Sequence, residues 1–298
     1  MSNPFRSVAF AMGAFCLFAS LPAYVQLLQP LSGFAATGQR ILWTVVLLVG
    51  CLLVFDCGQL TQIGRLLCRW RSWPGYLLGS ALVGAQFWAF IWGPMNGRTL
   101  EVALGYFILP LAMVLTGRLV YGERLRRLQW LAVGCATAGV VSSLLQSGGF
   151  SWLALLIALG YPPYFILRRY QSLPALQAFG IENILLLPVA IWACVELGEV
   201  AHPFDYSLSK LALFAGLGLL GSIPMLLWLS ASRVLALGVL GLLGNLEPTL
   251  IFCVGLWQGE TVEPSEWLLY ALIFSSLLLL GADAARQLWR RSSVSTTI

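Results

Sequence analysis

Long apolar runs separated by short polar connections make up nearly the whole chain. A helix needs about 20 apolar residues to cross a hydrocarbon core roughly 30 Å thick. Because backbone polar groups cannot stay unpaired in lipid, and because the runs are too continuous for the alternating strands of a membrane barrel, we expect helices. Ten such spans are predicted, approximately at 7–28, 34–55, 74–93, 99–120, 128–146, 150–168, 176–195, 210–230, 234–256 and 264–284.

The composition leads to the same class of protein. Of the 298 residues, 59% are hydrophobic and only 10% are charged, which lies far outside the range of soluble globular domains. The sequence therefore predicts an all-α membrane protein whose main partner is the lipid bilayer. The connections between the runs are short, so we expect no inserted soluble domain.

The positive charges predict the orientation of the chain. With a cytoplasmic N-terminus, fourteen arginines fall on the inside and only Arg40, Arg98 and Lys210 on the outside. Lysine and arginine in short loops stay on the cytoplasmic side, so we expect both termini to be cytoplasmic. This distribution also explains the net charge of +5 without nucleic acid as a partner. The fourteen inner arginines are Arg6, Arg65, Arg69, Arg71, Arg118, Arg124, Arg126, Arg127, Arg168, Arg169, Arg233, Arg286, Arg290 and Arg291.

A comparison of the chain with itself indicates a repeat. "LPAY" at 21–24 matches "YPPY" at 161–164, an offset of 140, and the pair "LP" and "GE" at 109–123 matches "EP" and "GE" at 247–260, with offsets of 138 and 137. This period divides the chain into two halves of five helices, 1–146 and 147–298. Because five is odd, the second half must cross the membrane in the opposite sense. Inverted repeats are typical of secondary transporters.

Several segments also resemble a known family. "LEVALGYFILPLAMVLTGRLVYGERLRRLQWLAV" at 100–133, "QRILWTVV" at 39–46, "FWAFIWGPMNGRTLE" at 87–101 and "EPTLIFCVGLWQGE" at 247–260 are similar to RarD-like permeases, in the EamA branch of the drug/metabolite transporter superfamily. The resemblance implies a ten-helix permease of the bacterial inner membrane with two EamA repeats. It also implies transport of a small molecule without ATP.

The residues that other classes of protein need are scarce. There is one histidine, His202, so a histidine-based metal site or a Ser-His-Asp triad has too few parts. No GxxxxGK[ST] segment is present, so the chain carries no ATPase motif of that type. We therefore expect no catalytic residues, no metal and no cofactor.

Charged residues inside the predicted spans are costly and usually functional. Arg40 lies about two turns below the outer end of the second span, and Glu101 lies at a similar depth at the start of the fourth. One hypothesis is a structural ion pair between Arg40 and Glu101. The alternative is that Arg40 binds an anionic group of the substrate. Glu182 in the seventh span is either interfacial or paired with Arg168 or Arg169.

Two polar residues lie deeper, in the ninth span. Asn245 and Glu247 are roughly 17–20 Å along this helix, at or just past the midplane. Pro248 should break this helix about one turn before itself, near Gly244. Pro110 should break the fourth span in the same way. Burial disfavours the charged form of a carboxyl group, so Glu247 is a candidate for coupling transport to protons and Asn245 for binding substrate. The alternative is a kinked packing face on which Glu247 has a structural partner.

Aromatic residues form a candidate wall of a binding site. Trp88 and Trp92 share one face of the third span, and Tyr106 and Trp228 lie at interior depths of the fourth and eighth. Tryptophan in membrane helices more often marks the interface or contacts lipid, which is the alternative here. An aromatic wall would suit an amphiphilic metabolite or drug.

Together these features favour a secondary transporter that works by alternating access, most simply as an exporter. A channel or a membrane scaffold that transports nothing is the alternative, although no span offers the continuous polar lining of a channel. A homodimer is left open.

Overall fold

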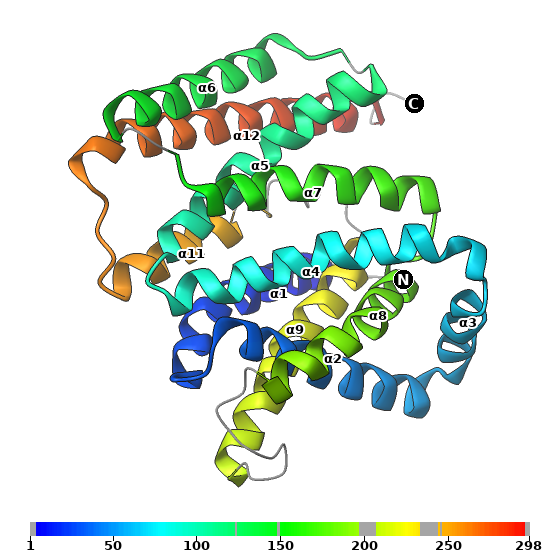
Figure 1. Ribbon diagram of the computed structural model, residues 1–298. Helices are drawn as coiled ribbons and strands as arrows, with labels where there is room; N and C mark the ends of the chain where they lie inside the picture. The colour runs from blue at the N-terminus through cyan, green and yellow to red at the C-terminus, as the bar shows by residue number, and fades with distance from the viewer. Residues whose placement is uncertain are drawn as a thin grey trace.

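The computed structural model describes residues 4–122, 124–147, 150–196, 207–232, 244 and 246–295. In these ranges the chain forms α-helices and short 3-10 turns, without a strand, as the all-α prediction expects. The helices lie side by side in one bundle (Figure 1). They are α1 (Pro4–Val25), α2 (Gly33–Phe55), α3 (Cys57–Leu67), α4 (Trp73–Met95), α5 (Thr99–Tyr121), α6 (Arg127–Ser147), α7 (Trp152–Gln171), α8 (Ala175–Glu196), α9 (Leu208–Ser232), α11 (Leu246–Trp257) and α12 (Trp267–Ser295).

Eight of the described helices are long and apolar enough to cross a membrane. The other two predicted spans correspond to α7 and α11. The tyrosines and prolines of α7 and its terminal Arg168 and Arg169 make it less apolar than the eight. α11 has 12 residues, and most of its predicted span before Leu246 lies outside the described residues. The described structure thus supports a multi-pass membrane protein and leaves the number ten a prediction.

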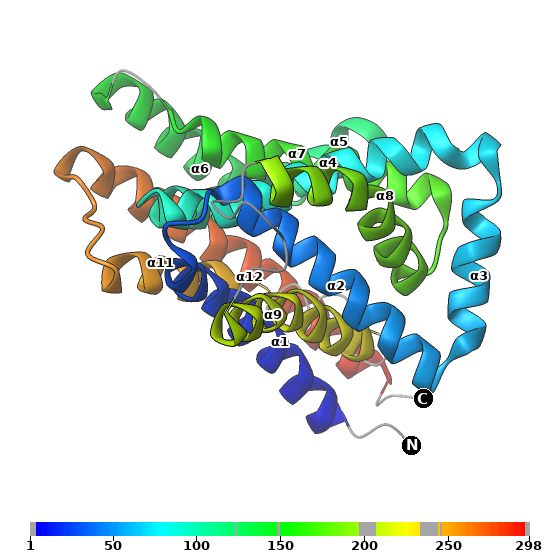
Figure 2. The ribbon, with the colours of Figure 1, turned by 60° about the horizontal axis from the view of Figure 1, so that its bottom comes forward.

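The helix α3 was not predicted. It begins after Asp56, whose carboxylate accepts a hydrogen bond from the backbone N–H of Gln59 at 3.2 Å and so caps the helix. With 11 residues and a largely polar surface it is too short to span a bilayer. α3 stands at one edge of the bundle, where it connects α2 to α4 and contacts α8 (Figures 1 and 2).

The antiparallel helix pairs include α2 with α8, α5 with α11, and α6 with α12. In the first pair, a Cβ atom on Gly38 would lie only 2.6 Å from the carbonyl oxygen of Ala190, while Leu48, further along α2, lies beside Gly180, earlier in α8. In the second, Leu100 lies beside Gly255. The contacts also join α1 to α9 and α4 to α7.

The third antiparallel pair, α6 and α12, lies along one side of the bundle (Figure 1). Arg126, just before α6, forms an ion pair with Asp283 just past the middle of α12, at 3.3 Å. In the middle of α6, Gly139 lies against the backbone of Leu269. Small residues of this kind let membrane helices approach closely.

The largest apolar core joins helices from both halves of the chain. Phe107 of α5, Leu217 of α9 and Ile251 of α11 are fully buried in it. Large apolar side chains such as Phe55 and Leu119 remain exposed. Exposed apolar surface of this extent is expected where a protein faces lipid.

The predicted helix break at Pro110 is wrong. α5 is continuous from Thr99 to Tyr121 with Pro110 inside it. A proline removes one backbone hydrogen bond, here to the carbonyl of Tyr106, while the bonds on either side maintain the helix. Pro248 is buried in the first turn of α11, and the predicted break before it falls mainly on residues outside the described ranges.

Candidate functional site

Arg40 is a buried cation without a carboxylate partner in the described structure. It lies in the second turn of α2 and is 5% exposed. Its guanidinium carbon lies 4.0 Å from the centre of the Phe87 ring of α4. Both Nε and Nη1 are buried without a hydrogen-bond partner. A face-on aromatic ring attracts a cation but accepts no conventional N–H···O hydrogen bond, so the directional donors of Arg40 stay available.

Two tyrosines lie close to this cation. The hydroxyl groups of Tyr106 on α5 and Tyr161 on α7 are 3.2 Å apart and hydrogen-bonded to each other. Arg40 and Glu247 of α11 both lie within electrostatic range of these hydroxyls. We call Arg40, Phe87, Tyr106, Tyr161 and Glu247 the Arg40 cluster. Its members come from five helices.

A close approach of α9 completes the surroundings of Arg40. A Cβ atom on Gly221 would lie 3.2 Å from the Nε atom of Arg40 and 2.9 Å from the hydroxyl oxygen of Thr44. The next residue, Ser222, is buried, and its hydroxyl has no hydrogen-bond partner. Only a residue without a side chain lets α9 come this close to the guanidinium.

The structure gives Glu247 no structural partner among the described residues. Its side chain is half-buried in the first turn of α11, and within these ranges it makes no hydrogen bond or ion pair. Asn245, the second candidate of the predicted ninth span, lies outside the described residues.

The hypothetical ion pair between Arg40 and Glu101 is not formed. Glu101 instead binds Arg98 through both carboxylate oxygens, at 2.6 Å and 2.8 Å, and accepts a hydrogen bond from the hydroxyl of Ser151. Arg98 lies three residues before Glu101, at the start of the same helix, so its side chain reaches the carboxylate directly. Arg40, which belongs to another helix, contacts the ring of Phe87 instead.

Trp88 and Trp92 do share a face, and they belong to a second group of aromatic rings. Their ring centres are 5.5 Å apart, and Trp152 at the start of α7 lies 6.1 Å and 5.4 Å from them. Phe34 at the start of α2 joins the group, and Arg98 lies over Trp92 and Trp152. These rings gather at the end of the bundle that the charges predict to be outside, which we call the outer end.

Trp228 lies elsewhere again. It packs with Ala11 and Phe15 of α1, Ala231 of α9 and Leu246 of α11 in a small apolar cluster. The first half of α1 is predicted to be the cytoplasmic half. The four aromatic candidates therefore do not form one wall: only Tyr106 belongs to the Arg40 cluster.

The sequence analysis missed two members of this cluster. Tyr161 stands in the "YPPY" segment that indicates the repeat, and its counterpart in "LPAY" is a leucine. Phe87 directly precedes Trp88, and only Trp88 and Trp92 of this helix were predicted to line a site. A tyrosine next to two prolines in an apolar run was the signal that could have found Tyr161.

Glu182 belongs to a separate polar cluster near the predicted cytoplasmic end. It is buried and accepts a hydrogen bond from the hydroxyl of Tyr164 at 3.0 Å. Arg168, rather than Arg169, lies 3.9 Å from its carboxylate. This pairing explains how the carboxylate is tolerated at such a place.

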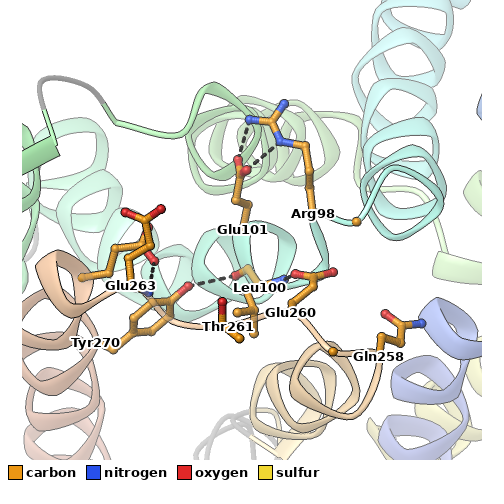
Figure 3. A pocket seen from close by; sticks show the side chains of 11 residues that line it. Arg98, Leu100, Glu101, Gln258, Glu260, Thr261, Glu263 and Tyr270 are labelled. Carbon is orange, nitrogen blue, oxygen red and sulfur yellow. Dashed lines mark hydrogen bonds and ion pairs between the residues drawn. The ribbon is translucent and has the colours of Figure 1, made fainter.

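A polar pocket of about 440 Å³ opens at the outer end, between α5, α11 and α12 (Figure 3). Glu260, which follows α11, points to the first turn of α5. Its two oxygens accept hydrogen bonds from the backbone N–H groups of Thr99 and Leu100, at 2.6 Å and 2.7 Å. The Thr99 hydroxyl donates to Gln258 at 2.7 Å, and the Gln258 amide donates to the carbonyl of Pro22 in α1 at 3.0 Å. These bonds connect α1, α5 and the end of α11.

Metal ligands do not gather in the described part of the chain. There, no group of three or more His, Cys, Asp or Glu side chains is placed to hold a metal ion. The acidic side chains of the outer pocket include Glu101 and Glu260, and both are already engaged, with Arg98 and with the N-terminus of α5.

Comparison with known proteins decides the family. The chain is 40% identical over 292 residues to the chloramphenicol-sensitive protein RarD of Pseudomonas aeruginosa, and the match covers 96% of this chain and 97% of that protein. The chain belongs to the RarD family. Among other relatives, an uncharacterized transporter of Pasteurella multocida is 36% identical over 96% of this chain and 99% of its own length. The protein RarD of Salmonella typhi is 31% identical over 94% and 95%.

These relatives confirm the predicted resemblance to RarD. They also indicate that the chain is a membrane transporter rather than an enzyme. No family model matches the chain. A solved crystal structure aligns with a TM-score of 0.57 over 94% of this chain and 98% of that one, at 18% identity. At this identity the likeness concerns the fold alone.

Proposed function

We propose that the chain is a secondary transporter of the bacterial inner membrane, of EamA type, that exports a small amphiphilic metabolite or drug by alternating access. The name of the Pseudomonas relative refers to chloramphenicol sensitivity, which is in keeping with a drug-sized substrate. Both termini lie in the cytoplasm in this proposal, as the distribution of arginines predicts.

Helix packing supports two inverted halves of five helices. The predicted repeat makes α2 the counterpart of α8, α5 of α11 and α6 of α12, and the two members of each of these pairs pack antiparallel, as inverted halves require. The contact of α1 with α9 has its counterpart in the contact of α7 with α4. Two similar halves of opposite orientation provide two similar gates around one site between them.

The observation that carries the proposal is the Arg40 cluster. Arg40, Phe87 and Tyr106 come from the first half, and Tyr161 and Glu247 from the second. An unpartnered buried cation is expensive in a membrane protein and is usually kept for function. A polar site shared between two halves is what a carrier needs, because relative movement of the halves exposes the site to each side in turn.

The hydrogen bonds of Glu260 form a candidate gate at the outer end of the bundle. They hold the N-terminus of α5, in the first half, to the end of α11, in the second. In the proposed cycle these hydrogen bonds are formed when the site is closed to the outside and are broken when it opens.

Counterflow in liposomes tests the proposal. Purified protein is reconstituted with unlabelled substrate inside, and the uptake of labelled substrate is followed. A carrier accumulates the label transiently, because exchange is faster than net flux. A channel gives simple equilibration, and a scaffold gives no uptake. Candidate substrates come from a thermal-shift screen, since a ligand that binds the folded state raises its apparent stability.

A further inference from the structure

Arg40 carries two buried donors without acceptors. Its Nε and Nη1 atoms lack hydrogen-bond partners in the described structure. Buried polar groups are nearly always satisfied, so each exception needs an explanation. A group that enters from outside the protein could satisfy both donors at once.

We infer that the substrate carries an oxyanion, a carboxylate or a phosphate, which binds the guanidinium of Arg40 between the two halves of the transporter. This inference rests on the proposed function and specifies its substrate class: a small organic anion with an apolar or aromatic body.

Arg40 differs from the arginines that form ion pairs. Arg98, Arg126 and Arg168 each have a carboxylate partner, Glu101, Asp283 and Glu182 respectively. Arg40 is the one arginine of the described chain that belongs to the buried residues, and it has none. A buried charge without a counter-ion is strongly destabilising, and a bound oxyanion would remove that cost.

The geometry of the donors suits an oxyanion better than a neutral polar group. A guanidinium offers parallel N–H donors that match the two oxygens of a carboxylate or phosphate. The tyrosine pair can add another donor. When the hydroxyl of Tyr106 donates to that of Tyr161, or the reverse, one of the two protons remains uncommitted.

The surroundings also suit an apolar body on the anion. Phe87 covers one face of the guanidinium, and Phe90 meets the Tyr106 ring edge to face at 5.3 Å. Phe165, which is partly exposed, stacks on Tyr161 at 5.8 Å. Aromatic rings bind apolar and aromatic groups without adding charge.

The test measures binding to the purified full-length chain in detergent by thermal shift. The probes are benzoate, indole-3-acetate and phenyl phosphate, each beside its neutral counterpart, benzamide, indole-3-acetamide and phenol. We expect at least one anion to stabilise the protein more than its neutral counterpart. Comparison of the carboxylates with phenyl phosphate identifies which oxyanion is preferred.

Substitutions assign the effect to Arg40. Charge-assisted hydrogen bonds predict about 10- to 100-fold weaker anion binding in Arg40→Gln. In Arg40→Lys, which keeps the charge and loses the fork of donors, the loss should be smaller. The matched control, Arg126→Gln, removes an arginine that is paired with Asp283 and half exposed, and should bind the anions unchanged. If Arg40→Gln does not fold, Tyr161→Phe serves instead and should weaken the anions selectively.

Equal stabilisation by anions and neutral counterparts, or unchanged anion binding in the folded Arg40 variants, would overturn the inference. Because binding is measured without transport, its outcome is separate from that of the proposed function. A chain that binds anions through Arg40 but shows no counterflow of them would contradict the transporter and keep the anion site. A chain that exchanges only neutral compounds would support the transporter and contradict the anion site.

Discussion

The carboxylate of Glu260 caps a helix that belongs to the other half of the chain, at the backbone N–H of Thr99, 2.6 Å away. Caps normally come from the residue just before the helix. Here the residue before the helix, Arg98, provides no such cap, and the carboxylate comes from a residue far along the chain. The stability of the first turn of α5 is thereby linked to the position of α11.

This link predicts the effect of Glu260→Gln. The amide keeps the shape of the side chain but loses its charge and one acceptor, which should weaken the outer contact by about 1 kcal/mol. A cysteine at Leu100, which is buried beside Gly255, should then react about fivefold faster with a membrane-impermeant maleimide. Glu263→Gln, in the same pocket, is the control and should leave the rate unchanged. Equal rates in both variants would contradict a gate at Glu260.

The ion pair of Glu101 with Arg98 predicts a double-mutant cycle. Alanine substitutions of Arg98 and Glu101 should be non-additive in the free energy of unfolding, by about 0.5–1 kcal/mol, since both side chains are partly exposed. The same cycle with Arg40 and Glu101 should be additive within about 0.5 kcal/mol. If the coupling energy of Arg40 with Glu101 exceeds that of Arg98 with Glu101, then Glu101 pairs with Arg40 in a conformation other than this one.

Two glycines of the same helix predict opposite changes in stability. An alanine at Gly38 would place its Cβ 2.6 Å from the carbonyl oxygen of Ala190, and overpacking of this kind costs about 1–3 kcal/mol. Gly50 has no atom within 4 Å of the same position, so an alanine there should stabilise the helix by about 0.5–1 kcal/mol. Thermal denaturation of both variants should give a lower midpoint for Gly38→Ala and a higher one for Gly50→Ala. The reverse order would mean that α2 and α8 are not in close contact.

Glu247 is the candidate for proton coupling, and Glu247→Gln tests it. The substitution keeps the shape of the side chain and abolishes its ionisation. Exchange of substrate should continue, while accumulation driven by a pH difference should be lost; both are measured in the same proteoliposomes. Glu263→Gln, in the outer pocket, should retain both activities. If Glu247→Gln still concentrates substrate with an unchanged pH dependence, the residue has a structural role.

The orientation of the chain is tested with a native cysteine. Cys68 is exposed just after α3, in a segment that the arginines predict to be cytoplasmic. In a variant that keeps Cys68 and lacks the other six cysteines, a membrane-impermeant reagent should label it only after the cells are opened. A cysteine at Thr261, in the outer pocket, should be labelled in intact cells. Labelling of Cys68 from outside would invert the orientation.

The positions of the helices follow from the apolar runs because lipid imposes helical structure on any long run without unpaired backbone groups. The predicted span 34–55 and the helix Gly33–Phe55 differ by one residue. α3 escaped prediction because its polar face removes it from a search for long apolar runs. The span predicted at 150–168 corresponds to α7, which continues three residues further, to Gln171.

The candidate site was predictable only in part. An arginine in an apolar run can be recognised as exceptional, so Arg40 was found. Its partners depend on how helices rotate against one another, which hydropathy does not determine. Glu101 was therefore assigned to Arg40, although Arg98, one turn away on the same helix, was nearer. For the same reason Trp88 and Trp92 were placed with Tyr106, although they gather with Trp152.

The short helix α3 lies at the edge of the bundle, and its contacts with α8 make it a place from which movements of α8 can be followed. Ile63 of α3 lies against Gly180 of α8, where an added Cβ would be only 2.7 Å from its terminal carbon, and the Gln177 amide of α8 donates to Gln59 at 3.2 Å. A rotation of α8 must therefore shift α3. In the proposed transport cycle, a fluorophore on an exposed position of α3, such as Thr61, would report the movement of α8 in real time.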